Sequence, residues 1–170
     1  MRMVVKGVVA LAAVLVAAGA YTYLARGIGS AWPRGTGTDA VFTERAVVRI
    51  PDARLTIRAE VARTNEDRQQ GLSGRRALSA GTGMLFVFNR LDEHGIWMPD
   101  MRFSIDVVWI AGGSVVDVTE RLPVPKRGET YLPIFRPSHP ALLALEVSAG
   151  TVAEHGIRKG QRVEVTFDGN

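Results

Sequence analysis

Residues 54–62, RLTIRAEVA, alternate strictly between polar and apolar side chains. Successive side chains of a β-strand point to opposite faces, so this period of two is typical of a strand with one buried face. Other short runs have the composition of strands, namely 46–50, 84–88, 103–110, 115–120, 141–147 and 161–167. A chain with many short strands is predicted to be mainly β, folded as a compact antiparallel β-barrel or sandwich.

Two short helices and one tight hairpin are predicted between these strands. Thr64 and Asp67 have the spacing of a capping box, and Gly71 suits the end of the helix that they begin. Residues 150–156 predict a second helix that ends at its last glycine. The pair Gly112-Gly113 favours a tight turn, so residues 115–120 are expected to return antiparallel beside 103–110.

The N-terminus predicts export from the cytoplasm. Residues 7–24 are uncharged and apolar, and Arg2 and Lys6 before them form a basic flank expected to stay on the cytoplasmic side. Residues 1–25 are therefore predicted to be a hydrophobic helix that acts as a signal anchor in the cytoplasmic membrane or as a signal peptide cleaved after Ala20. The anchor would hold the rest of the chain on the outer face of that membrane, and cleavage would release it into the periplasm or outside the cell.

The remaining chain divides into a linker and one domain. Residues 26–40 are rich in glycine and small polar residues, which predicts a flexible linker, and residues 41–170 are predicted to form the β domain. The net charge is +4, but the basic residues are scattered among acidic ones, so no nucleic-acid partner is expected. The absence of cysteine excludes disulfides, thiolate zinc sites and cysteine nucleophiles, and no cofactor is predicted.

Two irregular segments are candidates for a binding surface. The first is HGIWMPDM, residues 94–101, and the second is residues 121–140, which contain five prolines and have no usable period. Both combine aromatic with charged side chains, a mixture expected of a ligand surface. The sequence therefore favours a non-catalytic binding module for a small polar ligand, a glycan or a partner protein. Its candidate ligand-binding residues are Trp97, Met98, Asp100, Tyr131, Phe135 and Arg136.

Asp106 is the candidate for catalysis. It lies in a run, FSIDVVWI, that becomes apolar on both faces, and a buried carboxylate needs a partner or a raised pKa. An alternative hypothesis is therefore an acid/base enzyme that uses Asp106 with Asp100 or His94. The structural alternative is an ion pair between Asp106 and an arginine, for which the candidates are Arg75, Arg102 and Arg136. Asp117 and Glu146 raise the same question more weakly.

A further alternative is a copper(I) site. His94, Met98 and Met101 are spaced by four and three residues, and imidazole and thioether groups are soft ligands that suit copper(I). Pro99 breaks regular helix geometry between the two methionines. Trp97 and Met98 are also expected to close one end of the β structure, because their side chains carry large apolar area.

Several motifs together resemble a known family. They are VARTNEDRQQGLSGRRAL, GMLFVF, HGIWMPDMRFSIDVVWI, TYLPIFRP and LEVSAGTVAEHGIRKGQRVEV. In order and spacing they resemble DUF192, also named UPF0127, over about residues 46–167. The resemblance implies a compact β-barrel or sandwich in an exported or membrane-anchored protein, and it brings no established activity, cofactor or catalytic residue. Pro99-Asp100 stands where that family often has a lysine followed by Asn or Asp, so any role for that lysine is absent.

Overall fold

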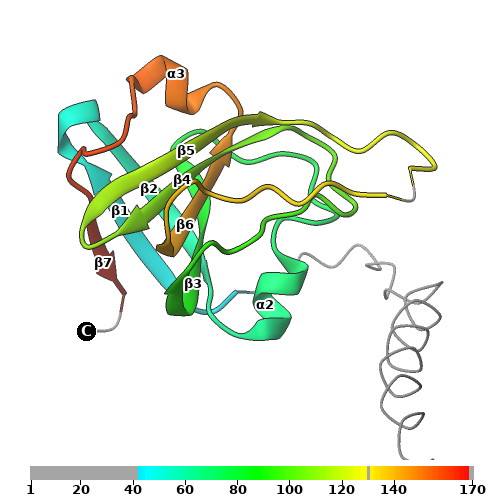
Figure 1. The fold of residues 1–170 in the computed structure, drawn as a ribbon, viewed down its shortest axis with the longest axis horizontal. Helices are drawn as coiled ribbons and strands as arrows, with labels where there is room; N and C mark the ends of the chain where they lie inside the picture. Colours follow the sequence, from blue (N-terminus) through cyan, green and yellow to red (C-terminus); the bar gives the residue numbers. More distant parts are fainter. Residues whose placement is uncertain (1–41, 130, 169–170) are drawn as a thin grey trace, which may run out of the picture. The chain divides into compact units, whose positions relative to one another are not determined.

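The computed structural model describes residues 42–129 and 131–168, and their strands form one mixed sheet (Figure 1). The predicted hydrophobic helix, residues 1–25, and the linker, residues 26–40, lie outside the described residues. Within the described ranges, no helix is long and apolar enough to cross a membrane. The strands are β1 (Arg45–Ile50), β2 (Leu55–Ala62), β3 (Thr82–Asp92), β4 (Ile105–Ala111), β5 (Ser114–Leu122), β6 (Ala141–Ser148) and β7 (Glu164–Phe167).

The strand order is β5-β4-β6-β3-β2-β1-β7, and one of its pairs is parallel. Strands β2 and β3 run parallel, whereas the other neighbours run antiparallel. A parallel pair needs a crossover connection, and residues 63–81, which include helix α2 (Asn65–Gln70), provide it here. The prediction of a mainly β protein is confirmed, but the prediction of a purely antiparallel sheet is wrong.

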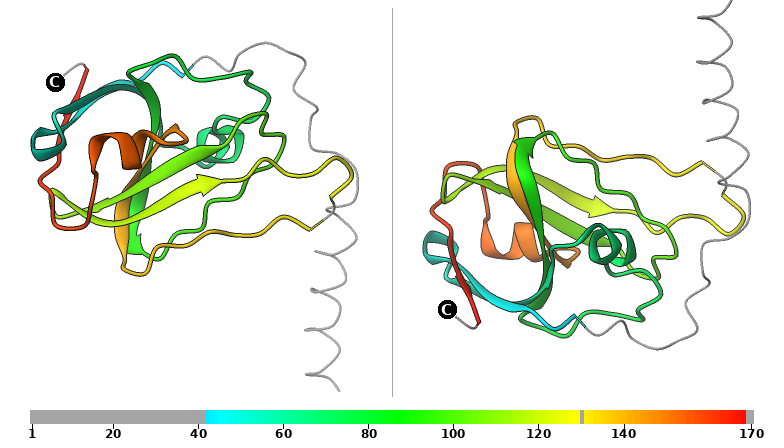
Figure 2. Two further views of the ribbon diagram at one scale, coloured as in Figure 1. Left: turned by 90° about the horizontal axis from the view of Figure 1, so that it is seen from above. Right: turned by 90° about the horizontal axis from the view of Figure 1, so that it is seen from below.

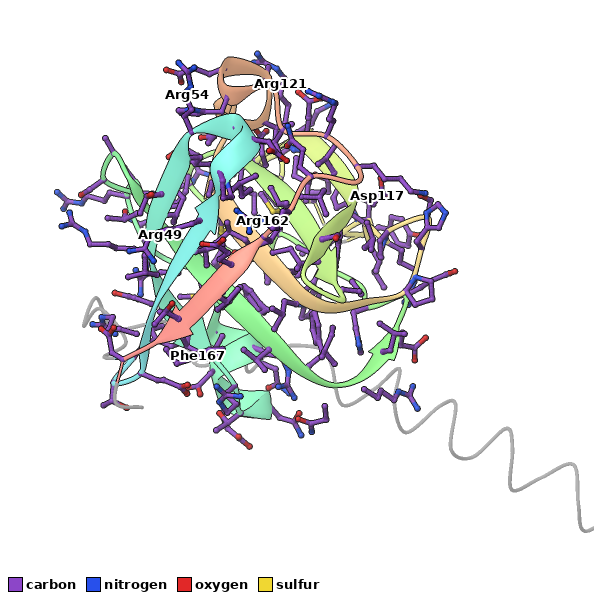
Figure 3. All side chains as sticks on the ribbon, turned by 90° about the vertical axis from the view of Figure 1, so that its left-hand side faces the viewer. Arg49, Arg54, Asp117, Arg121, Arg162 and Phe167 are labelled. Atoms are coloured by element: carbon purple, nitrogen blue, oxygen red, sulfur yellow. The ribbon has the colours of Figure 1, made fainter. Side chains whose placement is uncertain are left out.

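The predicted barrel or sandwich is also wrong, because a single open sheet holds all seven described strands. The edge strands β5 and β7 are not paired with each other, but the two edges meet just before β7 begins, where Ser114 bridges Arg162. Three backbone hydrogen bonds of 2.8 to 2.9 Å join residues 113–115 to residues 160–163 there. Figure 3 shows the chain running from Arg162 through β7 toward Phe167, away from Asp117 on β5. The sheet therefore curls until its edges meet over this short stretch without closing along their length.

Both predicted helices are confirmed. In α2 the Thr64 hydroxyl accepts a hydrogen bond from the Asp67 amide at 3.0 Å, and the Asp67 carboxylate accepts one from the Thr64 amide at 3.1 Å. Helix α3 (Thr151–His155) ends at Gly156, whose φ of 59° is left-handed. Figure 1 places α3 at the top of the view and α2 at the bottom, with the strands between them.

Both faces of the central strands are buried. Leu85, Val108 and Leu145 belong to one apolar cluster, which lies on one face of β3, β4 and β6. Their neighbours along the same strands belong to a second cluster on the other face, namely Met84, Phe86, Val107, Trp109 and Ala144. Two acidic side chains are buried in these strands, Asp106 on β4 and Glu146 on β6. By the alternation of the strands, Asp106 shares a face with Val108, and Glu146 shares the opposite face with Ala144.

Candidate functional site

The two irregular segments of the sequence lie side by side. Ile96 and Phe135 exchange two backbone hydrogen bonds, at 2.9 and 2.8 Å, and the Arg136 guanidinium donates to the Glu93 carbonyl at 2.6 Å. A Cβ atom on Gly95 would collide with the Ile134 side chain, so glycine permits this close approach. Both views of Figure 2 show the yellow part of the second segment as an arm that extends beyond the sheet and returns to β6.

A pocket of about 460 Å³ opens beside this contact. It is bounded by residues 65–73 (α2 and the turn after it), by β3 and by residues 94–101, and we call it the α2–β3 pocket. Its apolar walls include Phe86, Phe88, Ile96, Trp97, Met98 and Met101, and α2, the turn after it and β3 add polar side chains. Apolar walls combined with polar groups are typical of small-molecule sites.

Glu146 is the acidic group of this pocket. It lies on β6, paired with Met84 of β3 on one side and Val107 of β4 on the other, and the residue is 4% exposed. Among the described residues, no hydrogen bond or ion pair joins its carboxyl group to another side chain or to the backbone. Its oxygens are not sealed from solvent, because no fully buried polar side-chain atom of the described residues lacks a partner. Burial raises the pKa of the Glu146 carboxyl from 4.5 to about 8, because the charged form loses its hydration. The group is therefore mostly protonated and neutral at pH 7.

The basic groups that line the pocket are engaged with the protein. The Arg68 guanidinium donates to the carbonyls of Arg63 and Val87 and lies 5.9 Å from the centre of the Phe88 ring. Arg90, with 79% of its side chain exposed, forms an ion pair with Asp92 at 2.6 Å. These two cations therefore do not neutralise Glu146.

His94 packs against the aromatic wall of the pocket. Its imidazole stacks on the Phe88 ring with 3.8 Å between the ring centres and 12° between the planes. Its Nε2 donates to the Arg90 carbonyl at 2.8 Å, so Nδ1 is the ring nitrogen that remains to bind a metal. Met98 and Met101 line the same pocket, so the structure gathers the three candidate copper ligands around one cavity. Among the residues described, no cluster of three His, Asp or Glu side chains suits a metal ion.

Asp106 is fully buried, but it is not part of the pocket lining. Its carboxylate accepts hydrogen bonds from the backbone amides of Arg121, Gly150 and Val152, at 2.8, 2.9 and 2.9 Å. Arg121 belongs to a bulge of β5 opposite Asp106, and the other two amides lie at the start of α3. The partners of Asp106 are thus backbone amides, whereas the sequence analysis expected an arginine side chain. Of the arginines considered for that ion pair, Arg75 pairs instead with Glu60.

Asp117 supports the second irregular segment rather than the pocket. Its carboxylate accepts hydrogen bonds from the Ser138 amide at 2.6 Å and the Ser138 hydroxyl at 2.8 Å. Burial opposes its ionisation, but these bonds and one from the Val118 amide outweigh burial and lower the pKa of Asp117. The carboxylate thereby fixes the point where the segment returns to β6.

The structure separates the predicted ligand-binding residues into two groups. Trp97 and Met98 line the α2–β3 pocket, whereas Asp100 is exposed outside it with a left-handed φ of 52°. Phe135 and Arg136 lie next to the pocket through their contacts with residues 93–96, and the Tyr131 residue is 82% exposed on the arm. The pocket thus forms around one of the two segments, and the other supports it.

Several lining residues were not singled out from the sequence. They are Arg68, Gln69 and Gln70 of α2 and Phe86 and Phe88 of β3, which meet residues 94–101 through tertiary contacts alone. Glu146 did leave a signal, because it is the one charged residue in the apolar run ALLALEV. The sequence does not say which face of the sheet that residue occupies.

Comparisons with known proteins place the chain in a family. A search of curated proteins gave no significant match. A proposed transcription regulator from Sinorhizobium meliloti 1021 has a similar fold, with a TM-score of 0.65 and 27% identity over 75% of this chain and 98% of that one. A protein of unknown function from Novosphingobium aromaticivorans DSM 12444 gives a TM-score of 0.61 and 26% identity over 71% of this chain and 83% of that one. The family model described as "DUF192: Uncharacterized ACR, COG1430" matches residues 46–165, so the chain belongs to the DUF192 family.

Proposed function

We propose that this protein is a non-catalytic binding module that takes a small organic molecule in the α2–β3 pocket. The observation that carries the proposal is a pocket of about 460 Å³ that is lined by aromatic and thioether side chains and by one buried carboxyl group. A cavity with apolar walls and several polar groups gives a ligand both contact area and a fixed orientation. The segment around Phe135 supports the pocket through its pairing with Ile96.

The proposed location is outside the cytoplasm. The apolar run of residues 7–24 behind Arg2 and Lys6 supports export, either anchored on the outer face of the cytoplasmic membrane or released by cleavage after Ala20. Alkaline phosphatase fused after Asn170 is expected to be active in cells, because that enzyme needs an oxidising compartment. An inactive fusion that is present at normal abundance would contradict export.

Nucleic acid is not part of the proposal. Several arginines of the domain form ion pairs with carboxylates, as in the pairs Arg63–Glu44, Arg75–Glu60 and Arg162–Glu164. A phosphate backbone is bound by clustered basic side chains that remain available to it. These pairs support a small-molecule partner over DNA or RNA.

A second candidate function, general acid catalysis, rests on the same carboxyl group. Its pKa of about 8 keeps Glu146 protonated at pH 7, which is the state that a general acid requires. The sequence-based alternative placed this role on Asp106, whose carboxylate is saturated by three backbone amides away from the pocket. Conversion of a bound compound, detected by NMR and abolished by Glu146→Gln, would favour catalysis over simple binding.

The binding proposal is tested with the full chain in lipid nanodiscs and a library of small organic fragments. Ligand binding is followed by calorimetry for the native chain, for Trp97→Ala in the pocket wall and for Tyr131→Ala on the exposed arm. Trp97→Ala is expected to weaken binding by about tenfold or more with little change in thermal unfolding, and Tyr131→Ala is expected to have no effect. Binding that is lost only in Tyr131→Ala would move the site to the arm.

A further inference from the structure

We infer that the ligand of the α2–β3 pocket carries a protonated amine, which binds the Glu146 carboxylate, on a compact apolar body. This inference rests on the proposed function, since it names the class of molecule that the same pocket takes. It follows from three features of the pocket: a buried acid without a partner, walls that suit a cation, and basic groups that are already engaged.

The buried acid is the first feature. Glu146 is 4% exposed between Met84 and Val107, it lines the pocket, and no hydrogen bond or ion pair from the described residues reaches its carboxyl group. A purely apolar ligand would bury that group without a partner, which costs free energy. A ligand with an ammonium group supplies three N–H donors and the missing counter-charge in one step.

The walls are the second feature. Phe86, Phe88 and Trp97 line the pocket together with the thioethers of Met98 and Met101. Aromatic faces carry negative quadrupole charge that attracts cations, and methionine is a polarisable side chain that adapts to the shape of a ligand. An acid and aromatic rings that line the same pocket therefore favour an organic cation over an anion.

The basic groups of the pocket are the third feature. Arg68, Arg90 and His94 are the positively charged or titratable groups in the lining besides Glu146. Arg68 is held by two carbonyls, Arg90 is paired with Asp92 at the surface, and His94 donates to the Arg90 carbonyl. The Arg90 pair lies in contact with solvent, where water and salt screen its charge, whereas the Glu146 carboxyl is deep in the protein. An ammonium group thus finds its strongest partner in Glu146.

Binding of an amine is coupled to the release of a proton. At pH 7 the amine arrives as ammonium and Glu146 is mostly protonated, so the carboxyl proton passes to solvent when the ion pair forms. The ammonium group keeps its three protons, and about one proton is released for each ligand bound. Calorimetry in buffers of different ionisation enthalpy counts that proton directly.

The test uses three probes of similar size that differ in one group. They are 2-phenylethylamine, 2-phenylethanol and 3-phenylpropionate, each titrated into the full chain in lipid nanodiscs at pH 7. The amine is expected to bind at least about tenfold more tightly than the other two, because hydrogen bonds to charged groups are the stronger ones. It is also expected to be the one probe that releases a proton.

Two variants locate the effect. Glu146→Gln keeps the shape of the protonated side chain, so it is expected to retain binding of the alcohol while losing both the preference for the amine and the proton release. Glu154→Gln removes a carboxylate from the exposed surface of α3 and is expected to behave as the native chain does. The thermal unfolding of each variant shows that it is folded.

The outcomes separate this inference from the proposed function. Equal binding of the three probes, or an amine preference that survives Glu146→Gln, would overturn the amine and leave the binding pocket standing. Binding of none of the probes at millimolar concentration would overturn both.

Discussion

Replacing Glu146 by glutamine is expected to stabilise the domain at neutral and alkaline pH but not in acid. In the folded chain, burial raises the pKa of this carboxyl from 4.5 to about 8, so the folded state keeps a proton that the unfolded state releases. Below pH 4.5 both states are protonated, so ionisation of the native side chain does not affect stability. As the pH rises from 4.5 to 8, stability is lost steadily, and above pH 8 the loss is complete. Glutamine does not ionise, so the variant escapes this loss.

The size of the effect follows from the shift. A difference of one between two pKa values corresponds to about 1.36 kcal/mol, so the rise from 4.5 to about 8 amounts to about 5 kcal/mol above pH 8 and about 3 kcal/mol at pH 7. Because the residue is 4% exposed, solvent screening reduces this figure little. A gain of about 3 kcal/mol is a large fraction of the stability of an ordinary domain.

The assay is urea unfolding of the full chain in lipid nanodiscs at pH 4, 7 and 9, followed by the fluorescence of the buried Trp109. The free-energy difference between Glu146→Gln and the native chain is expected to be near zero at pH 4 and to grow through pH 7 to pH 9. The control Glu154→Gln changes an exposed carboxylate and is expected to give a small, constant difference. A difference for Glu146→Gln that does not vary with pH would refute the account of its burial.

Three further predictions concern the supports of the site and the metal alternative. Asp106→Asn weakens the acceptor of three backbone hydrogen bonds, so it is expected to lower the free energy of urea unfolding by about 2 to 4 kcal/mol and to speed amide exchange at Gly150. A decrease below about 0.5 kcal/mol would contradict the stabilising role of Asp106. Gly95→Ala forces the two irregular segments apart, so amide exchange at Ile96 is expected to accelerate, and unchanged protection would show that the segments adjust. Silver(I) is used in place of copper(I) to test the hypothesis of a copper(I) site. That hypothesis requires the native chain to bind silver(I) and Met98→Leu to bind it more weakly, and equal binding by the two would contradict it.

The sequence by itself was sufficient for the local structure. The capping box of Thr64 and Asp67 and the turn at Gly112-Gly113 depend on hydrogen bonds and backbone angles within a few residues, and both are present. The alternation of residues 54–62 likewise predicts β2, because one buried face leaves a period of two in the sequence. These features need no knowledge of distant neighbours.

The candidate site was predictable only in part. Trp97 and Met98 were found because a mixture of aromatic and charged residues in an irregular segment is visible in one dimension. Asp106 was singled out because it is a lone acid in an apolar run, but the same description fits Glu146. The two positions share the same kind of signal, which is weaker at Glu146, and the sequence does not say which acid faces a cavity.

Tertiary structure decided the rest through strand partners and faces. Strand β3 pairs parallel with β2 because residues 63–81 cross over through α2, so the sheet is mixed. The same crossover places α2 along one side of the α2–β3 pocket. On that side lies Glu146, while Asp106 points to the opposite face and binds the amides at the start of α3. Each position depends on contacts between residues far apart in the chain, whereas periodicity and capping report only on near neighbours. The sequence therefore determined the local elements and singled out two acids in apolar runs, and the packing of those elements determined which acid faces the α2–β3 pocket.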